Sequence, residues 1–274
     1  MSWSPFLVDV DGFSNVTTIG GNLWFNNLVD LQSCDGFSNI ESVGGYARIS
    51  NLPMLTNLNG FVGLETVGDY LHIDNNPLLT DLDGLSKLQA VEDFFFLEFN
   101  NSLTHIDGLS NLSSIGGSLF VENNAALENL DGFSSLTKLS GFLNVENNAA
   151  LNQIDGLSGV TEIQGYLNIT ANPALIHVNG LQNIESVLST LSLENNEALA
   201  HLDGFTKLKT VGSDLSIENN NALTHIGGLQ SVESVGGDLE ILGNTALCTG
   251  FAETLAAGIV VEGDVGISDN KLCE

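Results

Sequence analysis

Aromatic side chains recur at every twenty-fourth position in two columns of this sequence, and an exposed group of such rings could bind a protein or a sugar. One column lies in the middle of a predicted strand, and the other directly precedes that strand. Together the two columns contain the candidate binding residues Trp24, Tyr46, Arg48, Tyr70, His72, Phe94, Phe96, Phe120, Phe142 and Tyr166. Exposed aromatic patches of this size mark interaction sites. The alternative is cross-strand aromatic pairing that only stiffens the sheet.

The composition of both columns favours binding over stiffening. Aromatic residues dominate the first seven repeats, whereas Ser, Thr and Asp occupy the last three. Stiffening alone would need no such change along the molecule. Several of the rings belong to Phe, which has no polar group, so we expect a protein ligand rather than a glycan.

An acidic column runs beside the aromatic columns, and its side chains could hold cations. It consists of Asp74, Glu98, Glu122, Glu146, Glu194 and Glu218. Carboxylates are ligands that Ca²⁺ prefers, but the sequence contains no EF-hand loop or comparable calcium motif. The two interpretations are a solvated acidic face and a ridge that binds Ca²⁺ loosely. We expect no other cofactor.

His177, His201 and His225 share another column on consecutive repeats and are candidate metal ligands. An exposed ladder of imidazoles without a metal is the alternative, because no Cys or second His accompanies them. The sequence contains no distinctive serine nucleophile, Walker loop or zinc-protease motif. Solenoid enzymes that act on polysaccharides carry long loops around the site, and no repeat here contains an insertion. We therefore predict no catalytic residue and no enzyme activity.

All these columns exist because ten repeats of equal length follow one another between residues 11 and 250. The consensus is D-G-(F/L)-S-x-L-x-x-V-G-G-x-L-x-I-x-N-N-x-A-L-x-x-L. Its L-x-I segment alternates with a period of two, which predicts a short strand. One repeat cannot bury its apolar side chains alone, but stacked repeats share one core. The return segment carries no helix signal, so the pattern predicts stacked parallel strands in narrow, all-strand coils.

Three positions of the repeat predict backbone roles. Gly12 begins a column that is Gly in all ten repeats, which indicates either positive φ or close approach of neighbouring coils. The Asp before this Gly can accept hydrogen bonds from backbone amides two residues further on. A column of Asn from Asn76 to Asn244 can satisfy buried backbone groups at each corner of the coil.

The charge balance excludes several classes of partner. The chain has 34 Asp and Glu residues against 6 Lys and Arg, which gives a formal net charge of −28. So few basic residues cannot neutralise a nucleic-acid backbone or an anionic membrane surface. Hydrophobic residues make up 43% of the chain, which indicates a folded body. No stretch approaches the roughly 18 apolar residues of a membrane span, so we expect no nucleic-acid partner and no membrane insertion.

The motif L-x-I-x-x-N-x-x-L, followed by L-x-G-L-x-x-L-x-x-I-G-G, resembles the leucine-rich repeats of receptor L-domains, which are similar to repeats of bacterial surface proteins. The resemblance covers essentially residues 7–250. It departs from ordinary leucine-rich repeats because two residues, not one, separate Asn124 from Leu127. The resemblance implies an all-β fold, a right-handed parallel β-solenoid of receptor L-domain type with ten coils. It also implies protein or glycan binding without a shared catalytic residue.

The end of the chain resembles the C-terminal cap of bacterial repeat proteins of this kind. Residues 248–258 predict a short helix, and a last strand follows it. Cys248 and Cys273 bracket this cap and are expected to form a disulfide, which suggests an oxidising compartment. Cys34 occupies an apolar column and is expected to be a buried free thiol. We expect one structural domain, with a partial N-terminal coil (1–10), the ten-coil solenoid (11–250) and the cap (251–274).

These observations predict a non-catalytic recognition module, extracellular or on a cell surface, that binds a protein or a glycan through the aromatic columns. A rigid acidic rod with a structural or spacer role in a surface layer, filament or adhesin is the alternative. A polysaccharide-active enzyme is a third interpretation. The open N-terminal edge is also expected to permit end-to-end self-association.

Overall fold

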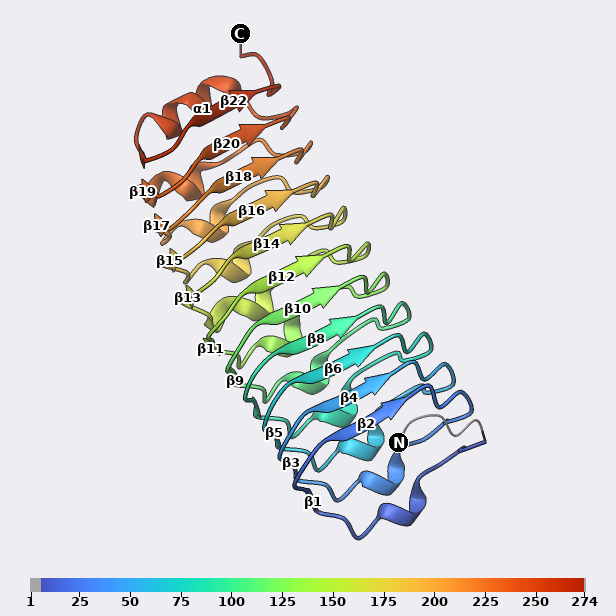
Figure 1. Ribbon diagram of the computed structural model, residues 1–274. Coiled ribbons are helices and arrows are strands. Elements are labelled where there is room, and N and C mark those ends of the chain that lie inside the picture. Colours follow the sequence, from blue (N-terminus) through green and yellow to red (C-terminus); the bar gives the residue numbers. More distant parts are fainter. Residues whose placement is uncertain (1–5, 274) are drawn as a thin grey trace.

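A computed structural model describes residues 6–273. In it, successive coils of the backbone have the same shape and stack along the molecule (Figure 1). Each coil contributes one four-residue strand to a main parallel sheet of eleven strands. These strands are β2 (Leu23–Asn26), β4 (Ala47–Ser50), β6 (Leu71–Asp74), β8 (Phe95–Glu98), β10 (Leu119–Glu122), β12 (Leu143–Glu146), β14 (Leu167–Thr170), β16 (Leu191–Glu194), β18 (Leu215–Glu218), β20 (Leu239–Leu242) and β22 (Val265–Ser268). Residues 1–5 of the predicted partial coil and residue 274 of the predicted cap lie outside the described residues. The prediction of stacked parallel strands in a repeat solenoid is confirmed.

Shorter strands of two residues run beside the main sheet and form two further parallel sheets. The first contains β1 (Thr18–Ile19), β3 (Ser42–Val43), β5 (Thr66–Val67), β7 (Ala90–Val91), β9 (Ser114–Ile115) and β11 (Lys138–Leu139). The second contains β13 (Glu162–Ile163), β15 (Ser186–Val187), β17 (Thr210–Val211), β19 (Ser234–Val235) and β21 (Val260–Val261).

The return segments differ from the all-strand prediction, because each coil also contains a 3₁₀ turn. These turns are η1 (Asp11–Phe13), η2 (Asp35–Phe37), η3 (Asn59–Phe61), η4 (Asp83–Leu85), η5 (Asp107–Leu109), η6 (Asp131–Phe133), η7 (Asp155–Gly159), η8 (Asn179–Leu181), η9 (Asp203–Phe205) and η10 (Gly227–Ser231). Side chains three positions apart lie on the same side of a 3₁₀ turn. Leu109, the last residue of η5, and Leu112, three residues later, are both fully buried.

The recurrent Gly allows neighbouring coils to approach each other closely. A Cβ atom on Gly132 would lie 1.9 Å from the carbonyl oxygen of Ile106 in the preceding coil. The equivalent distance is 1.8–2.0 Å in all nine coils from Gly36 to Gly228. Of the two explanations for this column, close approach is therefore correct. The predicted hydrogen bonds to the Asp side chain are wrong, because the 3₁₀ turn directs the amide of Phe37 to the carbonyl oxygen of Cys34 at 3.0 Å.

The column of Asn side chains is buried and links each coil to the next, as predicted. Oδ1 of Asn124 accepts a hydrogen bond from the backbone N–H of Asn100 at 3.1 Å. Its Nδ2 donates to the carbonyl oxygen of Leu97 at 2.8 Å. The ladder continues into the cap, where Oδ1 of Asn270 accepts from the N–H of Asn244. Buried backbone groups of successive coils are thereby satisfied.

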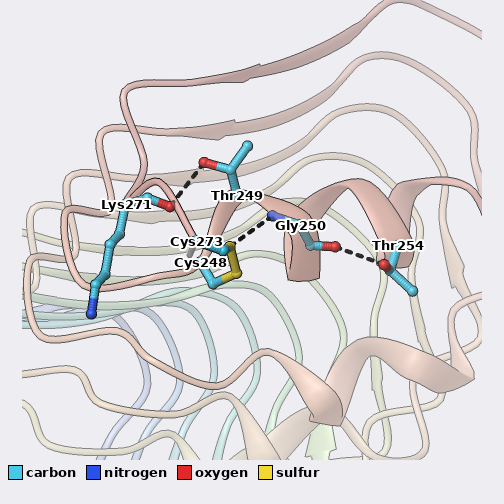
Figure 2. The surroundings of a disulfide bond; sticks show 6 residues. All are labelled: Cys248, Thr249, Gly250, Thr254, Lys271 and Cys273. Carbon is cyan, nitrogen blue, oxygen red and sulfur yellow. Dashed lines mark hydrogen bonds between the residues drawn. A yellow bond between two sulfur atoms is a disulfide. The ribbon is translucent and has the colours of Figure 1, made fainter.

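The C-terminal cap contains the single α-helix of the described residues, α1 (Thr249–Ala256), followed by β21 and β22. Figure 2 shows the disulfide between Cys248 and Cys273, whose Cα atoms lie 5.3 Å apart. The predicted short helix and disulfide are confirmed, and the disulfide indicates a non-reducing environment. Cys34 is buried and free, and desolvation raises the pKa of its thiol to about 12.

Candidate functional site

The outer face of the main sheet carries the candidate binding residues, because side chains alternate along each strand. In β8, Phe95 and Leu97 are buried, whereas Phe96 and Glu98 point outward and are half-buried. The parallel register places equivalent residues of adjacent coils opposite one another, so that Phe96 pairs with Phe120 and β8 aligns with β10 throughout. Columns in the sequence therefore become rows of neighbouring side chains on one face.

Six candidate residues form one contiguous group of rings, which we call the aromatic cluster: Tyr46, Tyr70, His72, Phe94, Phe96 and Phe120. Tyr46 stacks on Tyr70 with a centroid distance of 4.7 Å. Phe96 stacks on Phe120 at 4.8 Å. Tyr70 connects the two stacks, since its centroid lies 6.4 Å from that of Phe96, and His72 joins the cluster at 5.1 Å from Phe96. The cluster spans four consecutive coils.

The other aromatic candidates lie on either side of the aromatic cluster. Phe142 stacks on Tyr166 at 4.4 Å as a separate pair, and 39% of Phe142 is exposed. Trp24 lies on the edge strand β2, where it pairs in register with Arg48 and is 38% exposed.

The basic candidates are already paired with acidic residues of the following coil. Nε of Arg48 lies 3.4 Å from Oδ1 of Asp74, whose other oxygen accepts a hydrogen bond from Ser50 Oγ at 2.9 Å. Nε2 of His72 lies 3.1 Å from Oε2 of Glu98 and 3.4 Å from Oδ1 of Asp74. Asp74 is only 5% exposed. It therefore lies beneath its partners rather than on an open acidic ridge.

The remaining members of the acidic column are half-buried, and nearby side chains donate hydrogen bonds to several of them. Nδ2 of Asn144 donates to Glu122 at 2.6 Å, and Nδ2 of Asn147 donates to Glu146 at 3.1 Å. Burial raises the pKa of Glu122, and the carboxylates of Glu98 and Glu146 raise it further, against the opposing effect of the bond from Asn144. Glu194 and Glu218 accept bonds from Ser192 and Ser216 on their own strands.

A second acidic group at the C-terminal end of the face is not among the predicted site residues. Oδ1 of Asp214 accepts a hydrogen bond from the N–H of Asp238, whose own Oδ1 accepts from the N–H of Asp264. Desolvation and the nearby carboxylates of Glu218, Asp238 and Asp214 raise the pKa of Glu240. The change from aromatic to acidic residues in the outward columns is the sequence signal that could have identified this group.

Phe99 is another exposed residue that is not among the predicted site residues. It adopts φ 54° and is 44% exposed, at a position where most coils have Asn. The equivalent residue of every coil also has positive φ, so the aromatic residue type, which tolerates this conformation poorly, is what distinguishes Phe99. Comparison of the repeats at this position, where Asn51, Asn75 and Asn123 are the norm, would have detected it.

The His column is aligned in register, with bridges from His177 to His201 and from His201 to His225. The rings of His177 and His201 lie 6.0 Å apart, and Nδ1 of His201 lies 3.2 Å from Asp203 Oδ2. Within residues 6–273, no three His, Cys, Asp or Glu side chains come close enough together to hold a metal ion.

An apolar cavity of about 390 Å³ lies between α1 and η10, at the junction of the cap and the last coil. Ile226, Val232, Leu255 and Ile259 line it, and His225 lies at its polar margin. The repeat pattern does not predict this cavity, because the cavity arises where the helix replaces the regular coil.

The sequence matches no protein-family model, and no curated protein sequence is significantly similar to it. In the part of the chain that the structure describes, no helix has the length and apolar character to cross a membrane.

Proposed function

We propose that this chain is a non-catalytic recognition module, extracellular or on a cell surface, that binds a protein through the aromatic cluster. The observation that carries the proposal is the cluster itself, in which rings from four consecutive coils lie within 6.4 Å of a neighbouring ring on the outer face. Half-exposed rings leave apolar area in contact with water, and a partner that covers them gains the corresponding free energy.

Two features support binding over a purely structural role for these rings. The equivalent mid-strand positions of β16 and β18 hold Ser192 and Ser216, so the sheet forms the same ladder without rings. The exposed Phe99 follows Glu98 directly after β8, the strand that carries Phe96, and adds apolar surface beside the cluster. Phe side chains offer no hydrogen-bonding group to a sugar, which favours a protein over a glycan.

The proposal includes a right-handed solenoid of the receptor L-domain type. It is supported by the parallel strand of each coil, the 3₁₀ turn in each return segment and the buried Asn ladder. The disulfide of the cap supports a location outside the reducing cytoplasm.

Selection of peptides on the protein tests this function. A phage-displayed random peptide library is panned on the wild-type chain, and the selected peptides are titrated calorimetrically against wild type and against Phe96→Ser with Phe120→Ser. Loss of two central anchors should weaken binding about tenfold or more. Phe251→Ser, which changes a 58% exposed ring on the cap helix, is the control and should leave affinity unchanged.

Two results would contradict the proposed function. One is a folded double variant that binds the selected peptides as tightly as wild type. The other is a loss of several kcal/mol of stability, because that cost is typical of truncating core Phe residues and would show that the rings are structural.

A further inference from the structure

Two basic residues on the outer face contact acidic residues diagonally, across neighbouring coils. The residue in the middle of one strand contacts the acidic residue at the end of the next strand. Arg48 pairs with Asp74 at 3.4 Å, and His72 pairs with Glu98 at 3.1 Å. In these coils, a basic residue of the protein itself lies against the acidic side chain.

In the next two coils, the mid-strand residue is not basic. Phe96 and Phe120 occupy the mid-strand positions, and the diagonal acidic residues are Glu122 and Glu146. Among residues 6–273, no Lys, Arg or His forms an ion pair with either of these carboxylates. Their hydrogen-bond donors are the neutral amides of Asn144 and Asn147.

His72 shows how a basic group fits such a position. Its ring lies 5.1 Å from the ring of Phe96, while its Nε2 lies 3.1 Å from Glu98. Phe96 and Phe120 stack on each other, so the alkyl stem of an Arg or Lys side chain would pack on their outer edges while its charged group reaches a carboxylate.

We propose that the partner of the aromatic cluster is a cationic polypeptide segment that places Arg or Lys side chains over Phe96 and Phe120 and against Glu122 and Glu146. This inference rests on the proposed function and adds the chemistry of the partner. Basic side chains of the partner then form the diagonal ion pairs with Glu122 and Glu146 that this chain does not form itself.

Charge complementarity supports this occupant over the alternatives. A second copy of this chain, with its formal net charge of −28, would bring further negative charge to the face. A hydrated Ca²⁺ ion would gain nothing from the aromatic rings, whereas the alkyl stem of an Arg or Lys side chain packs on apolar surface. Burial and neighbouring carboxylates raise the pKa of Glu122, which is the expected state of a carboxylate without a cationic partner.

Short charged peptides provide the test. Fluorescently labelled tetra-arginine, blocked at both ends, is titrated by anisotropy at 150 mM NaCl against the whole chain, and tetra-citrulline serves as the neutral isostere. The site variant is Glu122→Gln with Glu146→Gln. The control is Glu41→Gln with Glu65→Gln, which removes two exposed charges of adjacent coils beside the shorter strands β3 and β5.

Tetra-arginine should bind wild type at least tenfold more tightly than tetra-citrulline. The site variant should lose about tenfold in affinity and the control less than twofold. Equal losses in both variants would overturn the proposal, because they would show only the diffuse attraction of an acidic protein. Failure of tetra-arginine to bind wild type would overturn it as well.

The outcome is separable from that of the proposed function. One outcome is that library peptides lose affinity for the Phe96→Ser with Phe120→Ser variant and keep full affinity for the site variant. That result would support the recognition face and overturn the cationic partner. Library peptides that are indifferent to the Phe96→Ser with Phe120→Ser variant would overturn both.

Discussion

Replacing Gly132 with Ala should destabilise the solenoid, whereas the same change at Gly12 should not. The added Cβ atom at Gly132 would lie 1.9 Å from the carbonyl oxygen of Ile106, and real Cβ atoms essentially never approach closer than 3.0 Å. The coil must therefore move by about 1.1 Å, the difference between these two distances. The obstacle is backbone, which cannot rotate away, so the cost should reach the upper part of the overpacking range, about 3 kcal/mol.

Thermal unfolding followed by circular dichroism measures this effect. A loss of about 3 kcal/mol corresponds to a fall in Tm of roughly 6–12 °C for a chain of this size. Gly12→Ala has open space around the added atom and should raise stability by about 0.4–1 kcal/mol, because it restricts the unfolded chain. A Gly132→Ala variant within about 1 kcal/mol of wild type, or equal losses at both positions, would refute the close-approach explanation.

Asn124→Ala should cost roughly 2–6 kcal/mol in urea unfolding, because it leaves one buried N–H and one buried carbonyl group unsatisfied. Asn101→Ala, at an exposed position that holds Ala in the next coil, should change stability little. Mass spectrometry of non-reduced peptides should find the Cys248–Cys273 bridge, and its reduction should loosen the cap first. Glu122→Gln should raise Tm at pH 7 and match wild type well below pH 4.5. The pKa of Glu122 is higher in the folded state than in the unfolded state. The contribution of Glu122 to stability is therefore complete only below its unfolded-state pKa, and it is lost as the pH rises through its folded-state pKa. A constant difference in Tm across this pH range would exclude that explanation.

Much of the fold was predictable because the repeat has one length throughout. A constant period without insertion places equivalent residues in register, and the alternation of apolar residues identifies the strand that stacks. The buried Asn ladder and the free Cys34 follow from the same columns. The 3₁₀ turns were not predictable in this way, since three-residue spacing of apolar side chains in a short return segment fits several turn types.

The sequence predicted which residues lie in rows on the outer face, but it did not predict which side chains contact one another. The repeat places Tyr, Phe and Glu in outward columns, and the sheet register brings each column together. The sequence alone does not distinguish a contact with the same position of the next coil from a diagonal contact with the end of the next strand. Side-chain length and packing on the sheet face decide between them, as when Arg48 covers Asp74 and His72 contacts Glu98.

By itself, then, the sequence determined the period, the parallel stacking, the acidic charge and the disulfide-closed end, because each depends on residue type and spacing within one coil or at one terminus. Only the tertiary structure decided which carboxylates are neutralised and which are not. Asp74 is buried beneath Arg48, whereas Glu122 and Glu146 remain without a basic partner among the described residues. The physical reason is that neutralisation requires two side chains from different coils to meet within about 4 Å, and that distance is set by packing across the sheet rather than by order along the chain.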